Sequence, residues 1–415
     1  MSDQRENTIL YLQQVLQKHQ TSEQPLTQAF EKMLSLTVCR HAVSLNALIK
    51  QFLAKPIPAK QSLLQTILIT ATAELLFMQS PAYAVINSYV NLAKKHAGKS
   101  YGGFVNAVLH KIADNKNALL ENYRQRLFPD SFLKILNQDY DKKTIRQIEQ
   151  GSLTQPPLNL TVKNDSTYWA KQLEAQKVNA QTISLSATGK IEDIKGYQEG
   201  VWWVQDTAAA LAVSGFTNPK GKKILDLCAA PGGKTAQLLN AGADVTSLDC
   251  SEQRLKILKQ NLSRLHLVPQ KVICADVLEY LENFKEEPFD GILLDAPCSA
   301  TGIFRRHPEI VYLKTSEDIE KQAALQQKIL SKISKALKIG GELLYCTCSI
   351  AKKEGEEQIS LFVKDNPNFK ISPLDNSEEK QSVTPEGFIR TLPFHYSEIG
   401  GCDAFFIAKL LKTRN

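Results

Sequence analysis

Two cysteines stand in turn-like segments that suit nucleophilic chemistry. Cys298 belongs to DAPCSATG at 295–302, and Cys348 belongs to YCTCS at 345–349. Each segment follows an apolar run that should form a strand, so both thiols are expected to project into one cleft beside a cofactor. A thiolate that adds to C6 of a pyrimidine converts the ring into an enamine, which can attack an electrophilic methyl group through C5. A lone cysteine is usually a small core residue, but two in such turns, each near an aspartate, favour catalysis.

A glycine-rich segment, DLCAAPGGKT at 226–235, stands where a strand should turn into a helix. Gly232 and Gly233 would let the backbone approach a ligand closely, and the following helix offers unpaired N–H groups. The spacing matches neither a Walker loop nor a GxGxxG fingerprint, which makes a phosphate grip the weaker option. We expect a nucleotide-type loop.

Two more aspartates follow the next apolar runs. Asp249 stands 23 residues after Asp226, the position from which an acidic residue reaches ribose hydroxyls in dinucleotide-type folds. Asp276 ends the next predicted strand and is expected on the adenine side. One such residue often only caps a helix, but three in series favour a bound adenosine moiety.

The elements that must position these residues alternate beyond residue 218. Short apolar runs, each followed by a helical segment, predict a parallel, doubly wound sheet with strands near 223–227, 245–248, 272–274, 291–294 and 342–345. Residues 1–138 show apolar positions at helical spacing and predict an all-α domain of five to seven helices. Residues 139–215 open with a polar helix and continue with short alternating runs, which predicts a small α+β linker domain; residues 216–415 form the catalytic domain.

The net charge of +7 is placed unevenly. Residues 1–138 hold 15 lysines and arginines against 8 acidic residues, so the whole excess lies in this part. Such an excess suits a phosphate-bearing partner, although a solvated lysine face is an equally good reading from charge alone.

Composition limits the class of protein. The chain is 43% hydrophobic and 22% charged, as in globular proteins. It lacks a signal-peptide layout and an uninterrupted membrane-spanning run, which predicts a cytoplasmic protein that does not enter a membrane. Its eight cysteines include no CxxC pair, so we expect neither a disulfide framework nor a metal site.

Four motifs, AAPGGKT, DAPCSATG, FRRHPEI and CTCS, together resemble the Sun (Nol/Nop/Sun, Fmu) family of RNA 5-methylcytosine methyltransferases. The stretches PAYA at 81–84 and FVNAVL at 104–109 are similar to the NusB-like domain of the RsmB branch. The resemblance implies an α/β fold, with a Rossmann-like class I methyltransferase domain preceded by an all-α NusB-like domain. It also implies S-adenosyl-L-methionine (SAM) as cofactor and small-subunit ribosomal RNA as partner; a monomer is expected.

The resemblance assigns roles to single residues. Cys348 is the implied nucleophile, Cys298 assists the elimination that frees it, and Asp295 binds the N3/N4 edge of the cytosine. Lys234 is also implied in catalysis, where its charge favours a thiolate. The implied RNA contacts are Arg305 and Arg306. The implied SAM contacts are Cys228, Ala229, Ala230, Pro231, Gly232, Gly233, Lys234, Asp249, Asp276 and Asp295.

Some alternatives stay open. Cys346 stands where relatives carry Ala or Ser, and its thiol should face the same way as that of Cys348. Trp202 and Trp203 can stack on bases or pack in a core. The chain can also be an idle RNA-binding or antitermination factor, although the intact cysteines disfavour this. An amino-group methyltransferase would need a Pro-Pro-Tyr/Phe loop where Asp-Ala-Pro-Cys stands, and the NusB-like domain can bind RNA or protein.

Overall fold

A computed structural model describes residues 2–22, 25–186 and 189–414, and the chain folds into two compact units. We call Met1–Gln138 together with Arg306–Thr315 the helical unit. We call Asp139–Arg305 together with Ser316–Asn415 the sheet unit. The predicted linker and catalytic domains thus fall into one unit, and a boundary between them at 215 stays a prediction.

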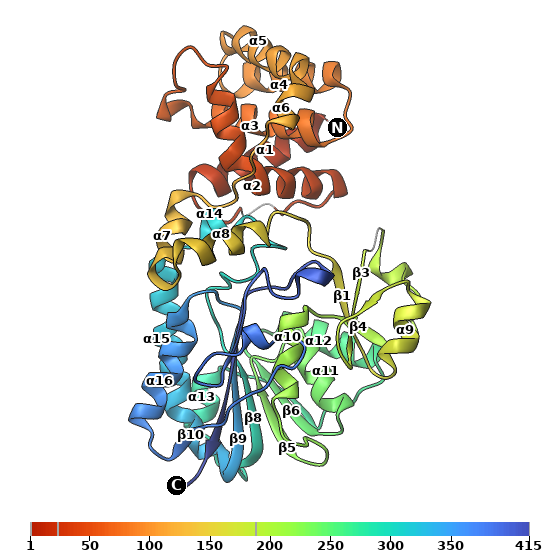
Figure 1. Cartoon of the computed structure of the whole chain (residues 1–415), viewed down its shortest axis with the longest axis vertical. Coiled ribbons are helices and arrows are strands. Elements are labelled where there is room, and N and C mark those ends of the chain that lie inside the picture. Colours follow the sequence, from red (N-terminus) through yellow and green to blue (C-terminus); the bar gives the residue numbers. More distant parts are fainter. Residues whose placement is uncertain (1, 23–24, 187–188, 415) are drawn as a thin grey trace. The chain divides into compact units, whose positions relative to one another are not determined.

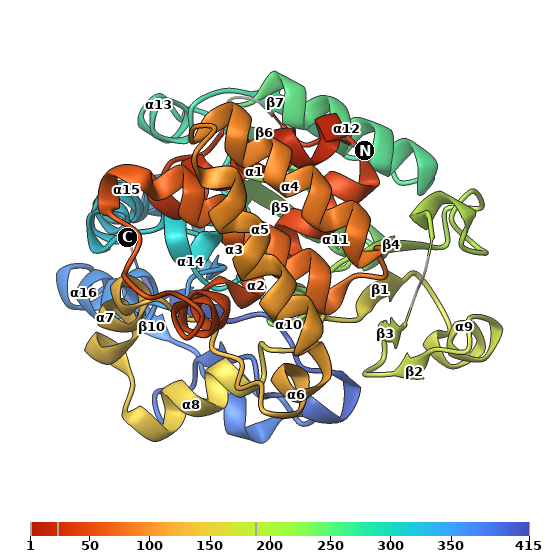
Figure 2. The same ribbon diagram turned by 90° about the horizontal axis from the view of Figure 1, so that it is seen from above.

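The helical unit is built around one apolar helix. Helix α3 is buried along most of its length and contacts α1, α2, α4 and α5 (Figure 2). Pro56 and Pro58 lie between α2 and α3, and Pro81 directly precedes α4. Proline lacks the backbone N–H that a helix interior needs, so it stands between helices. The helices are α1 (Ser2–Gln17), α2 (Ala29–Lys50), α3 (Ser62–Phe77), α4 (Ala82–His96), α5 (Tyr101–Asp114), α6 (Lys116–Glu121) and α7 (Asp130–Asp139).

A buried ion pair joins three of these helices. Arg5 of α1 donates two hydrogen bonds to the carboxylate of Glu74 in α3, at 2.9 and 2.6 Å. The hydroxyl of Tyr89 in α4 donates to the same carboxylate at 2.9 Å. Because Glu74 is fully buried, these bonds replace the water that its charge would otherwise bind.

A segment distant in sequence completes the helical unit. Helix α14 (Ile310–Leu313) contacts α1, and the hydroxyl of Tyr312 donates to the carbonyl of Cys39 at 3.0 Å. The carbonyl of Tyr312 lies 2.9 Å from Nδ1 of His19. Nothing in the sequence predicted that residues 306–315 would pack with the first 138 residues.

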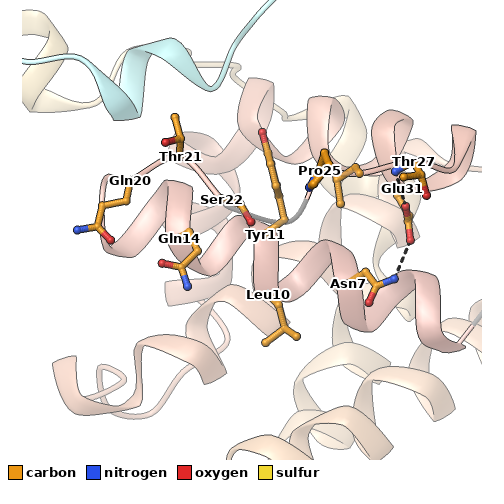
Figure 3. A pocket seen from close by; sticks show the side chains of 11 residues that line it. Asn7, Leu10, Tyr11, Gln14, Gln20, Thr21, Ser22, Pro25, Thr27 and Glu31 are labelled. Carbon is orange, nitrogen blue, oxygen red and sulfur yellow. Dashed lines mark hydrogen bonds between the residues drawn. The ribbon is translucent and has the colours of Figure 1, made fainter.

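A pocket of about 570 Å³ lies in the helical unit beside α1 (Figure 3). Tyr11 and Gln14 line it, and Asn7 donates to Glu31 across it at 3.0 Å. Glu31 is the one charged side chain among the described residues that line it. The pocket therefore offers no lysine or arginine to a phosphate, and the basic excess of this unit lies on other surfaces.

The sheet unit contains a small antiparallel sheet in the order β2-β3-β1-β4. Its strands are β1 (Leu158–Val162), β2 (Gln176–Lys177), β3 (Thr182–Leu185) and β4 (Trp202–Val204), and α9 (Ser166–Gln172) accompanies them. Leu160, Ile183 and Trp202 form its core. The helix α8 (Lys142–Gln150) precedes it, as the polar helix predicted there.

The large sheet has the order β10-β12-β9-β8-β5-β6-β7, with β11 paired to β12. The strands from β5 to β9 run parallel, as predicted, whereas β10, β11 and β12 are antiparallel additions. The bounds are β5 (Lys223–Leu227), β6 (Asp244–Asp249), β7 (Lys271–Cys274), β8 (Phe289–Asp295), β9 (Leu337–Thr347), β10 (Phe369–Ile371), β11 (Ile389–Thr391) and β12 (Phe405–Lys412).

Helices cover both faces of the large sheet (Figure 1). One group is α10 (Thr207–Ser214), α11 (Gly233–Asn240) and α12 (Glu252–Arg264); the other is α13 (Val277–Glu282), α15 (Ser316–Lys332) and α16 (Glu356–Asp365). Both faces of the central strands are therefore apolar: Leu225 and Leu343 are fully buried on one face, and Ile224 and Leu344 on the other. The predicted α/β fold is confirmed. No helix in the described part of the chain is long and apolar enough to cross a membrane.

Candidate active site

The parallel strands β8 and β9 bring the two cysteine turns together. Asp295 ends β8 and pairs with Cys346 near the end of β9, so the chain leaves both strands at the same edge of the sheet. Cys298 follows β8 by three residues and Cys348 follows β9 directly. Their sulfur atoms lie 3.4 Å apart, within hydrogen-bond distance for thiols. The two cysteine turns therefore meet as expected, and their opening into a cleft beside a cofactor stays a prediction.

The Cys298 thiol holds its proton strongly. The hydrogen bond with Cys348 raises the pKa of Cys298, and burial and the charge of Cys348 raise it further, to well above its ordinary value. Cys298 is consequently a neutral thiol at physiological pH and can donate its proton to the sulfur of Cys348. Both side chains are half-buried, which leaves the pair open to a ligand.

Cys346 has a different environment. Its side chain is fully buried, and its sulfur lies 3.5 Å from Oδ1 of Asp295. Burial raises the pKa of Cys346, and the charge of Asp295 raises it further. A thiolate is therefore disfavoured at Cys346, while Cys348 lies beyond the strand end, beside Cys298.

A buried lysine lies beside these groups. Nζ of Lys234 lies 2.8 Å from Oδ2 of Asp295 and 5.1 Å from the centre of the Phe405 ring. Burial lowers the pKa of Lys234, but the charge of Asp295 and the hydrogen bond to it oppose burial, and the net shift is upward. Lys234 thus remains a cation beside the cysteines.

A cavity of about 430 Å³ adjoins this cluster. It is lined by the loop 229–234 together with Trp203, Gln205, Asp226 and Asp295, a volume that suits a small cofactor. Gly232 has a φ of 104°, where a Cβ would lie 3.0 Å from Leu258, so the loop conformation and packing both favour glycine.

One carboxylate in this cavity is suited to a cationic ligand. Oδ2 of Asp226 accepts from the hydroxyl of Thr235 at 2.5 Å, whereas Oδ1 is buried with no hydrogen-bond partner among the described atoms. Burial raises the pKa of Asp226 to about 7, although the Thr235 bond opposes the shift. An ammonium group would satisfy Oδ1, and the N-terminus of α11 offers N–H groups to a carboxylate. These residues fit the two charged ends of an amino acid such as the methionyl part of SAM.

The other predicted cofactor residues support the loop in this structure. The buried carboxylate of Asp249 accepts from the backbone N–H groups of Ala230 and Ser251, at 3.1 and 3.0 Å. Asp276 is exposed, and its Oδ1 accepts from the backbone of Leu278 and Glu279 at the start of α13. Cys228 is half-buried and directly precedes the cavity-lining Ala229, and burial raises its pKa. Contacts of Asp249, Asp276 and Cys228 with a cofactor stay predictions.

The position of Arg305 argues against its predicted RNA contact. Its side chain is fully buried, and its guanidinium donates to the carbonyl of Gly400. A phosphate or base cannot reach a side chain without exposed surface, so Arg305 holds two loops together. Arg306 is half-buried and belongs to the helical unit, and its RNA contact stays a prediction.

The tryptophans pack in cores. Trp202 is fully buried and donates to the carbonyl of Lys195, and Trp203 donates to Gln205. Base stacking by these two side chains is therefore disfavoured. Arg264, which the sequence did not single out, lines the cavity with its guanidinium 4.1 Å from the Tyr197 ring. No motif marks Arg264, because it ends an ordinary polar helix.

Among the described residues, no three or more His, Cys, Asp or Glu side chains form a group that could hold a metal ion. The groups on which a mechanism can be built are the cysteines, Asp295 and Lys234, and we take them as the candidate active site.

Comparison with known proteins places these features in a family. Residues 216–411 match the family described as 16S rRNA methyltransferase RsmB/F, and residues 1–114 match the NusB family. The chain is 33% identical over 391 residues to ribosomal RNA small subunit methyltransferase B of Vibrio vulnificus (strain YJ016), covering 90% of this chain and 91% of that protein.

Two solved structures share the fold. PH0851 has a TM-score of 0.71 at 22% identity, over 93% of this chain and 91% of its own. NSun6 from Pyrococcus horikoshii with SFG has a TM-score of 0.58 at 18% identity, over 70% of this chain and 99% of its own. With the NusB match, the Rossmann-like sheet and the extended identity, the chain belongs to the RsmB/F family of 16S rRNA methyltransferases.

Proposed function

We propose that this rRNA methyltransferase transfers a methyl group from SAM to C5 of a cytosine in small-subunit rRNA, with Cys348 as the nucleophile. The observation that carries the proposal is the pair of sulfur atoms 3.4 Å apart beside the Asp295–Lys234 ion pair. An amino-group methyltransferase needs no thiol, whereas attack at C6 of a pyrimidine requires one.

The cavity beside loop 229–234 is the proposed SAM site. Asp226 would bind the ammonium group of SAM, and the start of α11 would bind its carboxylate. A similar fold was solved with SFG, a SAM analogue, which supports this choice of cofactor. SAM supplies an electrophilic methyl group when it is bound.

The residues of this chain have distinct proposed roles. The thiolate of Cys348 would form a bond to C6, and the electron pair released onto C5 would form the bond to the methyl carbon as the bond between that carbon and the sulfur of SAM breaks. Asp295 binds the N3/N4 edge and favours the protonated ring that accepts the thiolate. Lys234, which stays protonated, favours negative charge on Cys348.

Cys298 is suited to the last step. The main cause of its raised pKa is the hydrogen bond with Cys348, whose charge adds to the effect. Once Cys348 is bonded to C6, its sulfur carries no charge, and this contribution to the pKa is lost. Cys298 can then lose its own proton to water and accept the one on C5; the electron pair of the C5–H bond restores the C5=C6 double bond, and the S–C6 bond breaks to give back the Cys348 thiolate.

The proposed partner is small-subunit rRNA, as the names of the curated relatives state for those proteins. The helical unit carries the excess positive charge of the chain, which supports a role for it in binding RNA. RNA binding is thus proposed for residues 1–138 and methyl transfer for residues 216–415, the domain boundaries predicted from the sequence.

Bisulfite sequencing of small-subunit rRNA tests the proposal. The RNA is incubated with SAM and with wild-type protein, Cys348→Ala or Cys346→Ala. A single protected cytosine should appear with the wild type and with Cys346→Ala and be absent with Cys348→Ala. Protection that survives in Cys348→Ala and is lost in Cys346→Ala would assign the nucleophile to Cys346 instead.

A further inference from the structure

A single buried carboxylate binds both cysteine turns. Glu354 is fully buried, and its oxygens accept from the backbone N–H of Ser299 at 2.8 Å and from the Ser299 hydroxyl at 2.5 Å. The hydroxyl of Ser349 donates to the same carboxylate at 2.5 Å. Ser299 directly follows Cys298, and Ser349 directly follows Cys348. Glu354 therefore bridges the residues that directly follow the two cysteines.

The described bonds to this carboxylate come from neutral groups. Besides the two serines, Nε2 of Gln326 in α15 donates to Oε1 at 3.0 Å. Burying a carboxylate costs free energy unless strong hydrogen bonds replace its hydration. Hydrogen bonds to a charged oxygen are short and directional. Displacing either serine would leave part of a buried charge without a donor, so the arrangement resists separation of the turns.

Additional contacts restrict the same turns. The hydroxyl of Thr301 lies 3.0 Å from that of Ser299 and 3.0 Å from that of Ser349. The backbone N–H of Gly302 donates to the carbonyl of Cys348 at 2.9 Å. The backbone carbonyl of Glu354 accepts from the Tyr345 hydroxyl of β9 at 2.8 Å, so both ends of this residue are held.

We propose that Glu354 is a positioning residue that holds Cys298 and Cys348 at hydrogen-bond distance. It acts through Ser299 and Ser349, without contact to the reacting atoms. The catalytic consequence rests on the proposed function, since it matters for methyl transfer only if Cys348 is the nucleophile. The geometric part, the control of the distance between the sulfur atoms, does not depend on that function.

The sequence around Glu354 does not predict this role. Glu354 lies in KKEGEE at 352–357, a run that predicts a solvated, charged surface. The neighbouring Glu356 does bind a cation, Arg390, whereas Glu354 turns into the protein.

Disulfide formation between Cys298 and Cys348 measures the distance without any substrate. Full-length protein is equilibrated with mixtures of oxidised and reduced glutathione, free thiols are alkylated, and the bonded pair is quantified by mass spectrometry. The two thiols lose two protons and two electrons, and oxidised glutathione is reduced to two thiols. Glu354→Gln should lower the equilibrium constant for this disulfide by about tenfold, the effect of one lost hydrogen bond to a charged group.

Two further variants complete the design. Ser349→Ala removes one donor and keeps the carboxylate, and it carries the test if Glu354→Gln does not fold. Gln358→Met is the matched control, because Gln358 is also buried on this segment but donates to Ala323 of α15. The control should keep the wild-type constant. A folded Glu354→Gln or Ser349→Ala protein with the wild-type constant would overturn the proposal.

Kinetics separate this proposal from the proposed function. Glu354→Gln should lower kcat by about 10²-fold, as expected for misplaced reacting groups, with little change in the KM for RNA. Glu354→Asp, which keeps the charge, should recover part of the loss. Methyl transfer that persists in Cys348→Ala, together with a lowered disulfide constant in Glu354→Gln, would refute the proposed nucleophile and support the positioning role.

Discussion

Asp226 should make the protein without cofactor less stable as the pH rises. Burial raises the pKa of this carboxyl group to about 7 from an ordinary value of 3.8. Because the folded-state pKa is the higher one, the folded protein retains the proton longer than the unfolded chain does. The stabilising contribution is complete below about pH 4 and is lost as the pH rises through about 7.

The magnitude follows from these two pKa values. The ionisation costs the folded state about 1.7 kcal/mol at pH 5 and about 4.3 kcal/mol at pH 8, at about 1.4 kcal/mol per unit of difference in pKa. Asp226→Asn has nearly the same shape and cannot ionise. The difference in free energy of unfolding between Asp226→Asn and wild type should therefore grow by about 2.6 kcal/mol from pH 5 to pH 8.

Urea denaturation at several pH values, in protein freed of SAM, measures this difference. Asp290→Asn is an informative control. Burial raises the pKa of Asp290, but the hydrogen bonds from Lys338 and from the Lys223 backbone lower it more, so this variant should lose stability at pH 8 rather than gain it. A constant difference between Asp226→Asn and wild type across the pH range would refute the reasoning. SAM should stabilise wild type more than Asp226→Asn at pH 8, because the cation favours the carboxylate.

Three other changes have defined outcomes. Cys298→Ala should slow elimination about 10²-fold or more and accumulate a covalent protein–RNA adduct that survives SDS, and this adduct should be absent when Cys348→Ala is added. Arg5→Met should destabilise the helical unit by about 3–5 kcal/mol in urea denaturation, because Glu74 keeps its charge in a core. The double change Arg5→Met/Glu74→Leu should recover most of this loss; an equal or larger loss would contradict the account. Three exposed lysines of the helical unit, Lys94, Lys99 and Lys111, can be replaced by Gln. The slope of log affinity for rRNA against log salt concentration should then fall by about 0.9 for each phosphate that is no longer neutralised. An unchanged slope would show that these lysines are only solvated side chains.

The parallel strands could be predicted from the sequence because each is a short apolar run with both faces buried. The structure places β5 at Lys223–Leu227, as predicted, and extends the other four by one to five residues at one or both ends. The antiparallel strands β10 and β11 were missed. Each is three residues long and gains its stability from pairing with β12, which no local pattern reveals.

The candidate site was predictable where residue type limits the chemistry. A thiol pair next to Asp295 has few other uses, and the strand order brings its members together. Burial was not predictable. Arg305 and Glu354 both stand in charged runs, yet both side chains are fully buried, because the loops after β8 and β9 fold over them.

The segment 306–315 has a consequence for synthesis of the chain. The helical unit includes the first 138 residues, but its α14 is made only after much of the sheet unit has left the ribosome. N-terminal domains usually fold first during translation. Here the contacts of Cys39 and His19 with Tyr312 can form only after residue 312 has been synthesised. The helical unit therefore begins to be translated first but cannot complete its folding first.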